Sequence, residues 1–250
     1  PDGQRYMDTE ILGATVRTEI GRPANLFYGY KAQGVFSTSA EAQAAGLYIH
    51  DDNGVDRTAF EAGDMHFADL DGDHFITEAD RMVIGDPNPD IYGNIFTSVQ
   101  YRRLRLDVRF NYSLGNDIYN YTRQQLESGS RFMNQTTALA RRWQMEGQQT
   151  DIPRLSFQDP MGNSRFSDRW IEDGSYLRLK TVTLSYDLPV SSTFLQGLQF
   201  WVQANNVVTL TRYLGSDPEG TALSAVLGQG IDAGSLPQSR NFMVGIKINL

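Results

Sequence analysis

The feature that most constrains the fold is a segment in which apolar and polar residues alternate without a break. From Arg103 to Leu114 the sequence reads RLRLDVRFNYSL. Because successive side chains of a β-strand point to opposite faces, this pattern predicts a strand with one apolar face and one charged face. Strands of globular proteins usually have about five or six residues, so this longer alternation favours a tilted strand that crosses a membrane.

The same alternation recurs in four other places. Residues 181–188, 198–205 and 241–250 place apolar residues at every second position, and residues 95–101 do so more weakly. An all-β protein is therefore expected, and the chain ends on an apolar strand whose last residue is Leu250.

The connections between these segments differ in length. Arg102–Arg103 predicts a tight hairpin, and Pro189–Gly197 is a short link, whereas residues 116–175 and 208–240 form long connections. When the strands are followed in order, both short turns fall on one side and both long loops on the other. Outer-membrane barrels have this arrangement, with short periplasmic turns and long extracellular loops. Within the first long loop, residues 134–145 have a helical pattern.

Composition excludes several classes of protein. The chain has no cysteine and three histidines, which excludes disulfide scaffolds and thiol catalysis and leaves little for a histidine-based site. Lys and Arg number 22 and Asp and Glu 30, so the net charge of −8 argues against nucleic acid as a partner. No catalytic motif and no facing pair of carboxylates is evident, so we expect neither catalytic residues nor an enzyme.

The chain has no signal of a membrane-spanning helix or of secretion. No apolar run of about eighteen residues occurs. Its polar first residues lack the apolar core of a signal peptide. The chain is thus expected to be either cytoplasmic or a piece whose N-terminal part is missing.

One specific motif predicts a metal site. Residues 69–80 follow the calcium loop that places oxygen ligands at positions 1, 3, 5, 7, 9 and 12. These positions are occupied, in order, by Asp69, Asp71, Asp73, Phe75 (through its carbonyl), Thr77 and Asp80. Ile76 at position 8 is expected to be buried. We expect a structural Ca²⁺ ion with the weak affinity of extracellular modules, about 10⁻⁴ to 10⁻³ M.

Two departures leave an alternative open. Position 6 is His74 instead of the usual glycine, and position 12 is Asp80 instead of the longer glutamate. The alternative is an acidic turn that is closed by hydrogen bonds and holds no ion.

Several stretches together resemble the C-terminal part of the SusC/RagA family, the TonB-dependent outer-membrane transporters of Bacteroidetes. They occur in the family's order and span nearly the whole chain from about Tyr28. The stretches are Tyr28–Tyr30, Gly34–Phe36, Gly63–Asp64, Asp69–Asp73, Arg81–Pro89, Tyr112–Asn120, Ser167–Lys180, Asn205–Tyr213 and Asp217–Glu219.

The resemblance implies a barrel of about 22 strands in the bacterial outer membrane, surrounded by lipid and filled by an N-terminal plug. It implies import of oligosaccharides or peptides, together with a SusD-like surface lipoprotein and the TonB complex. This chain would supply about the last six antiparallel transmembrane strands of that barrel, and its plug domain would be absent. The calcium-type turn would lie within residues 64–86, and residues 116–175 and 208–240 would be outer loops that contact the lipoprotein or the ligand.

The residues also allow two other interpretations. A soluble calcium-dependent glycan-binding β-domain of a secreted protein would explain the alternation and the acidic loop. It would not explain the succession of short turns and long loops. A glycosidase would need facing carboxylates that the sequence does not show. The interpretation as a transporter therefore depends on one expectation, that the apolar faces of the strands contact lipid rather than a second sheet.

Overall fold

The computed structural model describes residues 5–50, 56–190, 194–220 and 226–249. The chain divides into two compact units, which we call the loop unit and the strand unit. The loop unit comprises residues 1–88, 117–172 and 221–234, and the strand unit comprises residues 89–116, 173–220 and 235–250. Within the described residues, no helix has both the length and the apolar character needed to cross a membrane.

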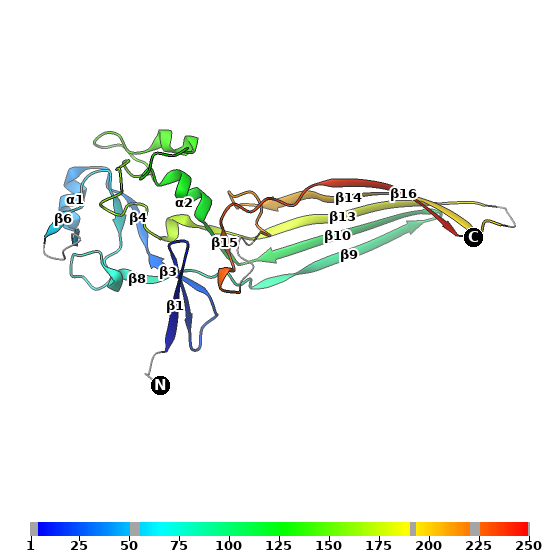
Figure 1. Cartoon of the computed structure of the whole chain (residues 1–250), viewed down its shortest axis with the longest axis horizontal. Helices are drawn as coiled ribbons and strands as arrows, with labels where there is room; N and C mark the ends of the chain where they lie inside the picture. The colour runs from blue at the N-terminus through cyan, green and yellow to red at the C-terminus, as the bar shows by residue number, and fades with distance from the viewer. Residues whose placement is uncertain (1–4, 51–55, 191–193, 221–225, 250) are drawn as a thin grey trace. The chain divides into compact units, whose positions relative to one another are not determined.

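The strand unit is built on one antiparallel sheet of long strands, which lie side by side in Figure 1 in the order β16-β14-β13-β10-β9. The strands are β9 (Ile91–Tyr101), β10 (Leu104–Leu114), β13 (Tyr176–Leu188), β14 (Gly197–Thr211) and β16 (Asn241–Asn249). All five alternating segments of the sequence are thus strands. The described sheet has five strands where about six were expected, and Leu250 lies outside the described residues.

The register aligns the apolar residues of all five strands. Leu106 pairs with Val99 on one side and with Leu184 on the other. Leu184 pairs in turn with Val202, and Val202 pairs with Val244. Because residues in register point to the same face, these side chains form a continuous apolar row across the sheet.

The opposite face is mainly polar. In the neighbouring row of paired residues, Ser98, Asp107, Thr183 and Gln203 are in register, and Met243 ends the row. The Thr183 hydroxyl lies 3.2 Å from Oε1 of Gln203, so neighbouring strands are also joined through side chains on this face. The two faces of the sheet therefore differ in chemistry, one apolar and one mainly polar.

A β-bulge at Lys180 interrupts the regular pairing. Thr181 pairs with Arg109, but Leu179 pairs with Phe110, so β13 has one more residue than β10 between these pairs. The extra residue shifts the two-residue alternation by one position. Leu179 and Val182 are three residues apart, so in a regular strand they would point to opposite faces. Because of the bulge, Leu179 lies on the apolar face beside Phe110, as Val182 does beside Val108.

The loop unit contains short strands and helices in several small sheets. A four-stranded sheet has the order β1 (Tyr6–Ile11), β2 (Ala14–Glu19), β3 (Leu26–Tyr30) and β8 (Arg81–Gly85). A three-stranded sheet comprises β12 (Ile171–Asp173), β11 (Asp117–Asn120) and β15 (Ile231–Asp232). The remaining pairs are β4 (Ala32–Val35) with β7 (Met65–Phe67), and β5 (Tyr48–His50) with β6 (Arg57–Ala59). The helices are α1 (Ser39–Ala45), α2 (Tyr121–Glu127) and the 3₁₀ turns η1 (Glu78–Asp80), η2 (Thr137–Arg141), η3 (Asp168–Trp170) and η4 (Val226–Gly228).

Two hydrophobic clusters form the core of the loop unit. One gathers around Phe36, Met65 and Phe67, and the other around Phe27 and Trp170. The second cluster joins residues that are far apart in the sequence, since it also includes Ala14, Val16, Tyr119, Phe166 and Ile231. The long connection 116–175 is therefore largely folded into a core rather than structureless.

The helix predicted over residues 134–145 is wrong in extent and type. Only the 3₁₀ turn η2 forms there, and it ends at Arg141, because the next residue, Arg142, has an extended ψ of 158°. Trp143 then donates its backbone N–H to the Ile152 carbonyl and its indole N–H to the Ser37 carbonyl. These tertiary contacts override the local helical preference. The α-helix of this connection is α2, which begins after Asn120, whose side chain accepts the backbone N–H of Arg123.

Candidate functional site

Among the described residues, no second sheet covers the apolar face of the strand unit. Leu104 and Ile246, on the face expected to meet lipid, are 43% and 58% exposed, and Val244 is 78% exposed. Val108 and Phe110 on the same face are half-buried by their neighbours. A contiguous apolar surface of this kind marks a site of interaction with a membrane or with another protein.

The charged residues of the strands lie on the other face. Arg105 forms an ion pair with Asp107 at 3.0 Å, and Arg109 belongs to the same side of β10. An arginine on a lipid-facing position near the middle of a bilayer costs about 2–4 kcal/mol. The observed orientation avoids this cost, because each arginine points away from the apolar row.

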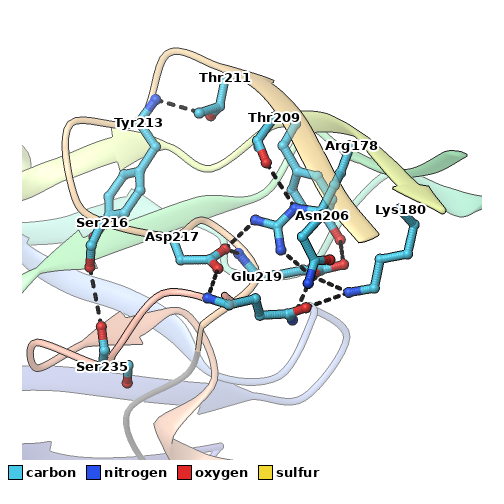
Figure 2. A network of polar contacts seen from close by, with 12 residues as sticks. Arg178, Lys180, Asn206, Thr209, Thr211, Tyr213, Ser216, Asp217, Glu219 and Ser235 are labelled. Atoms are coloured by element: carbon cyan, nitrogen blue, oxygen red, sulfur yellow. Dashed lines mark hydrogen bonds and ion pairs between the residues drawn. The ribbon is translucent and has the colours of Figure 1, made fainter. Parts of the chain in front are cut away.

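Next to the bulge in β13, a polar network joins the strand to the long connection that follows β14. Figure 2 shows Arg178 between the acidic residues of this connection, with Nη2 2.5 Å from Oδ1 of Asp217 and Nη1 2.6 Å from Oε2 of Glu219. Nε of Arg178 donates to the Thr209 hydroxyl at 2.9 Å. Arg178 and Asp217 are both almost fully buried, so the guanidinium is satisfied within the protein.

Lys180 and Gln238 complete the network. Nζ of Lys180 donates to Glu219 at 3.0 Å and to Oε1 of Gln238 at 2.5 Å. The backbone N–H of Gln238 donates to Oδ2 of Asp217 at 2.9 Å. We call Arg178, Lys180, Asp217, Glu219 and Gln238 the loop clamp. It contains two cations and two carboxylates, so it fastens the connection to the strand and leaves no net charge for a ligand.

Hydrogen bonds control the ionisation of the clamp's buried carboxylate. Burial raises the pKa of Asp217, but the hydrogen bonds from Arg178 and from the backbone N–H groups of Gln238 and Glu219 outweigh burial. The pKa of Asp217 is therefore lower than its ordinary value, and the carboxylate stays charged inside the clamp.

The acidic loop brings together three of its six predicted ligands. One carboxylate oxygen from each of Asp69, Asp71 and Asp73 lies within 4.8 Å of the others. Asp69 also shapes the loop, because its two oxygens accept the backbone N–H groups of Gly72 at 2.7 Å and His74 at 2.9 Å. Oxygens at these separations are close enough for a single Ca²⁺ ion to contact all three, since each Ca–O distance is about 2.3–2.6 Å.

The other three predicted ligands have hydrogen-bonded neighbours of their own. Asp80 is fully buried, and its oxygens accept the backbone N–H groups of Leu70 and Thr77 at 2.7 and 2.8 Å. The Thr77 hydroxyl caps η1 by accepting the N–H of Ala79. Next to Phe75, the bridge to Tyr48 uses the neighbouring His74 carbonyl and Ile76 N–H and does not use the Phe75 carbonyl.

The backbone accommodates the first departure from the calcium motif. His74 at position 6 adopts a left-handed conformation with φ of 68°, which is where the motif normally has glycine. Ile76 at position 8 is buried, with 5% of its surface exposed, as this position of the loop requires.

Repulsion between the carboxylates is visible in the electrostatics of Asp71. The backbone N–H of Asp73 favours the charged form, but burial and the negative charges of Asp73, Asp80 and Asp69 together outweigh it and raise the pKa of Asp71. A bound cation would relieve this repulsion, so the donor set fits Ca²⁺ for the three gathered aspartates.

The loop clamp had not been identified from the sequence. Arg178, Lys180, Asp217 and Glu219 belong to stretches that carry the family resemblance, but no pattern in the sequence links them to each other. The sequence does offer one signal, the two basic residues Arg178 and Lys180 at the start of a strand that otherwise contains mainly Leu, Thr and Val. This signal does not indicate which carboxylates pair with them.

Comparison with known proteins finds relatives of one kind. The chain is 32% identical over 236 residues to TonB-dependent receptor P3 of Formosa agariphila, and the match covers 91% of the chain. It is 28% identical over 247 residues to TonB-dependent receptor P26 of the same organism, which covers 96% of the chain. No protein-family model matches the chain.

Among solved structures, the fold is similar to that of the RagAB peptide transporter. The TM-score is 0.75 with 23% identity, and the match covers 99% of this chain and 24% of that one. The RagAB peptide importer in its open-open state gives a TM-score of 0.71 with 24% identity. The resemblance stated from the sequence motifs is therefore confirmed. The chain spans 22% and 24% of the lengths of the two receptors it matches.

Proposed function

We propose that the chain is the C-terminal part of a TonB-dependent importer of the bacterial outer membrane, and that β9, β10, β13, β14 and β16 are consecutive membrane strands of its barrel. The observation that carries the proposal is the apolar row of the strand unit, which is exposed on one face and opposed by charged residues on the other. Long antiparallel strands with these two faces match a barrel wall between lipid and a polar lumen.

We propose further that the whole importer takes up oligosaccharides or peptides under a SusD-like surface lipoprotein, with energy from the TonB complex. The family resemblance supports this, and the RagAB structures are described as those of a peptide importer. In this assembly the chain contributes strands and outer loops and has no catalytic role. The loop clamp, which holds the connection between β14 and β16, would shape one of these outer loops.

A pair of adjacent substitutions in β13 tests the orientation. Leu184 is 44% exposed on the apolar face, and the neighbouring Thr183 lies on the polar face. In the full-length parent protein, Leu184→Arg should block insertion into lipid vesicles and reduce the amount in the outer membrane, because a charge is placed in hydrocarbon. Thr183→Arg, the matched control, should insert like the parent because its charge faces the lumen.

The same pair separates this proposal from the soluble alternative. If the chain were a water-soluble glycan-binding domain, an arginine at the exposed position of Leu184 would leave folding unchanged or improve solubility. Equal insertion of the two variants, or a parent protein that stays monomeric in buffer without detergent, would overturn the membrane orientation.

We also propose that Asp69, Asp71 and Asp73 bind a structural Ca²⁺ ion in the loop unit. The mutual proximity of their carboxylate oxygens supports a cation at this point. The Phe75 carbonyl and water would complete the oxygen ligands, whereas Asp80 and Thr77 stabilise the end of the loop through backbone hydrogen bonds. When bound, the ion would offset the repulsion between the three carboxylates.

A further inference from the structure

A hollow lies at the hairpin between β9 and β10. Its volume is about 640 Å³, and it is lined by Tyr101, Arg102, Arg103, Leu104 and Tyr186. The lining combines two guanidinium groups with two tyrosine rings and a leucine. A ligand that fills this hollow must therefore offer both a group for cations and an apolar portion.

The two arginines are available to bind an anion. Both are exposed, and within the described ranges no carboxylate forms an ion pair with either guanidinium. Arg102 lies 5.4 Å over the ring of Tyr101 and has a left-handed backbone with φ of 56°. The nearby Asp187 donates its backbone N–H to the Arg103 carbonyl, and its Oδ1 accepts from Gln199.

The walls of the hollow belong to the apolar face of the sheet. Tyr101 pairs with Leu104, and Leu104 pairs with Tyr186, which in turn pairs with Phe200 and through it with Ile246. Tyr101 is 69% exposed and Tyr186 is 42% exposed. Tyrosines at the end of an otherwise apolar row are typical of the boundary between hydrocarbon and lipid headgroups.

We propose that this hairpin binds a phospholipid of the adjoining leaflet, with its phosphate held by Arg102 and Arg103 and its acyl chains lying along Leu104, Tyr186 and the apolar row. The inference rests on the proposed function, since it needs the strands to be in a membrane. Guanidinium groups hold phosphate oxygens through paired, charge-assisted hydrogen bonds. An acidic protein partner would satisfy the two arginines, but it would gain nothing from the neighbouring apolar row.

The test measures lipid binding to the detergent-purified parent protein by native mass spectrometry. The probes are phosphatidylglycerol, glycerol phosphate as the headgroup alone, and diacylglycerol as the tails alone. We expect phosphatidylglycerol to bind. Glycerol phosphate and diacylglycerol should each bind at least about tenfold more weakly than the lipid, because the site uses both the phosphate and the acyl chains. In Arg102→Gln/Arg103→Gln, binding of phosphatidylglycerol should fall about tenfold.

Three matched variants complete the experiment. Arg102→Lys/Arg103→Lys keeps both charges and should retain most of the binding. Tyr186→Ala removes a wall of the hollow without touching the arginines and should also weaken binding. Arg22→Gln, at an exposed arginine of the loop unit, should leave binding unchanged.

Either of two results would overturn the inference. The first is unchanged phosphatidylglycerol binding in both the double glutamine variant and the Tyr186 variant. The second is glycerol phosphate binding as tightly as the lipid, which would indicate an anion site rather than a lipid site. Both can occur in a protein that inserts normally and passes the Leu184 and Thr183 test, so failure here is distinguishable from failure of the proposed function.

Discussion

Nη2 of Arg178, near the start of β13, lies 2.5 Å from Oδ1 of Asp217, in the connection that follows β14. The side chains are 4% and 5% exposed. Because a buried charge without a partner is costly, each residue makes the other tolerable at its position. The main effect of the pair is therefore to hold the connection in one position against β13. Its net contribution to the stability of the fold is small by comparison.

Removing one partner should show this dependence. Asp217→Ala removes one of the two carboxylates of the buried Arg178 and leaves Glu219 at 2.6 Å. We expect the parent protein to lose about 1–3 kcal/mol of stability, with easier proteolysis within residues 212–240. Removing the acidic partner of the exposed pair Arg22–Glu19, as in Glu19→Ala, should cost less than about 1 kcal/mol. The double variant Arg178→Met/Asp217→Leu should recover much of the loss. Equal effects of Asp217→Ala and Glu19→Ala would contradict the role of the clamp.

The clamp should also respond to acid in a defined direction. The pKa of Asp217 is lower in the folded protein than its ordinary value of about 4, because the hydrogen bonds from Arg178 and the backbone outweigh burial. A depressed pKa means that the stabilisation is complete above about pH 4 and is lost as the pH falls through the lower, folded-state pKa. Proteolysis by an acid-active protease should therefore cut residues 212–240 faster only below about pH 4. Asp217→Asn should lack this step, and a step near neutral pH would point to another group.

Calcium removal should destabilise the loop unit specifically. With a chelator present, we expect a lower thermal midpoint that Ca²⁺ restores and Mg²⁺ does not, at Ca²⁺ concentrations of about 10⁻⁴ to 10⁻³ M. Asp71→Asn should abolish the response, because it removes a gathered carboxylate whose other contacts are few. Glu78→Gln, at an exposed acidic residue outside the ligand set, is the control that should keep it. A chelator that leaves the midpoint unchanged would favour the turn closed by hydrogen bonds alone.

The strands could be predicted from sequence because alternation and register depend on the same two-residue period. The segment 103–114 reads as one strand, and β10 is regular through nearly the same residues. In β13 the sequence alternates regularly only from Thr181, although the strand begins at Tyr176. The bulge at Lys180 shifts the period by one residue there, and a local pattern cannot reveal a shift that is defined by pairing with another strand.

The loop unit could not be derived in this way. Its core depends on contacts between distant segments, such as Phe27 against Phe166, with ring centroids 6.2 Å apart. The acidic loop lies between these two cases. Its spacing located the gathered carboxylates. The spacing did not show that both oxygens of Asp80, the last residue of the 3₁₀ turn η1, accept backbone N–H groups of the same loop.

The register partners Trp201 and Gly245 provide the last prediction. A β-carbon at Gly245 would overlap the indole of Trp201, which lies across the glycine on the polar face of the sheet. Gly245→Ala should therefore destabilise the parent protein by about 1–3 kcal/mol through overpacking, seen as a lower thermal midpoint. In a Trp201→Ala background the overlap is gone, and alanine in a strand is favoured over glycine by about 0.5–1 kcal/mol, so the same substitution should become stabilising. The reversal of sign between the two backgrounds is the diagnostic result, since a general intolerance of β16 to side chains would give destabilisation in both.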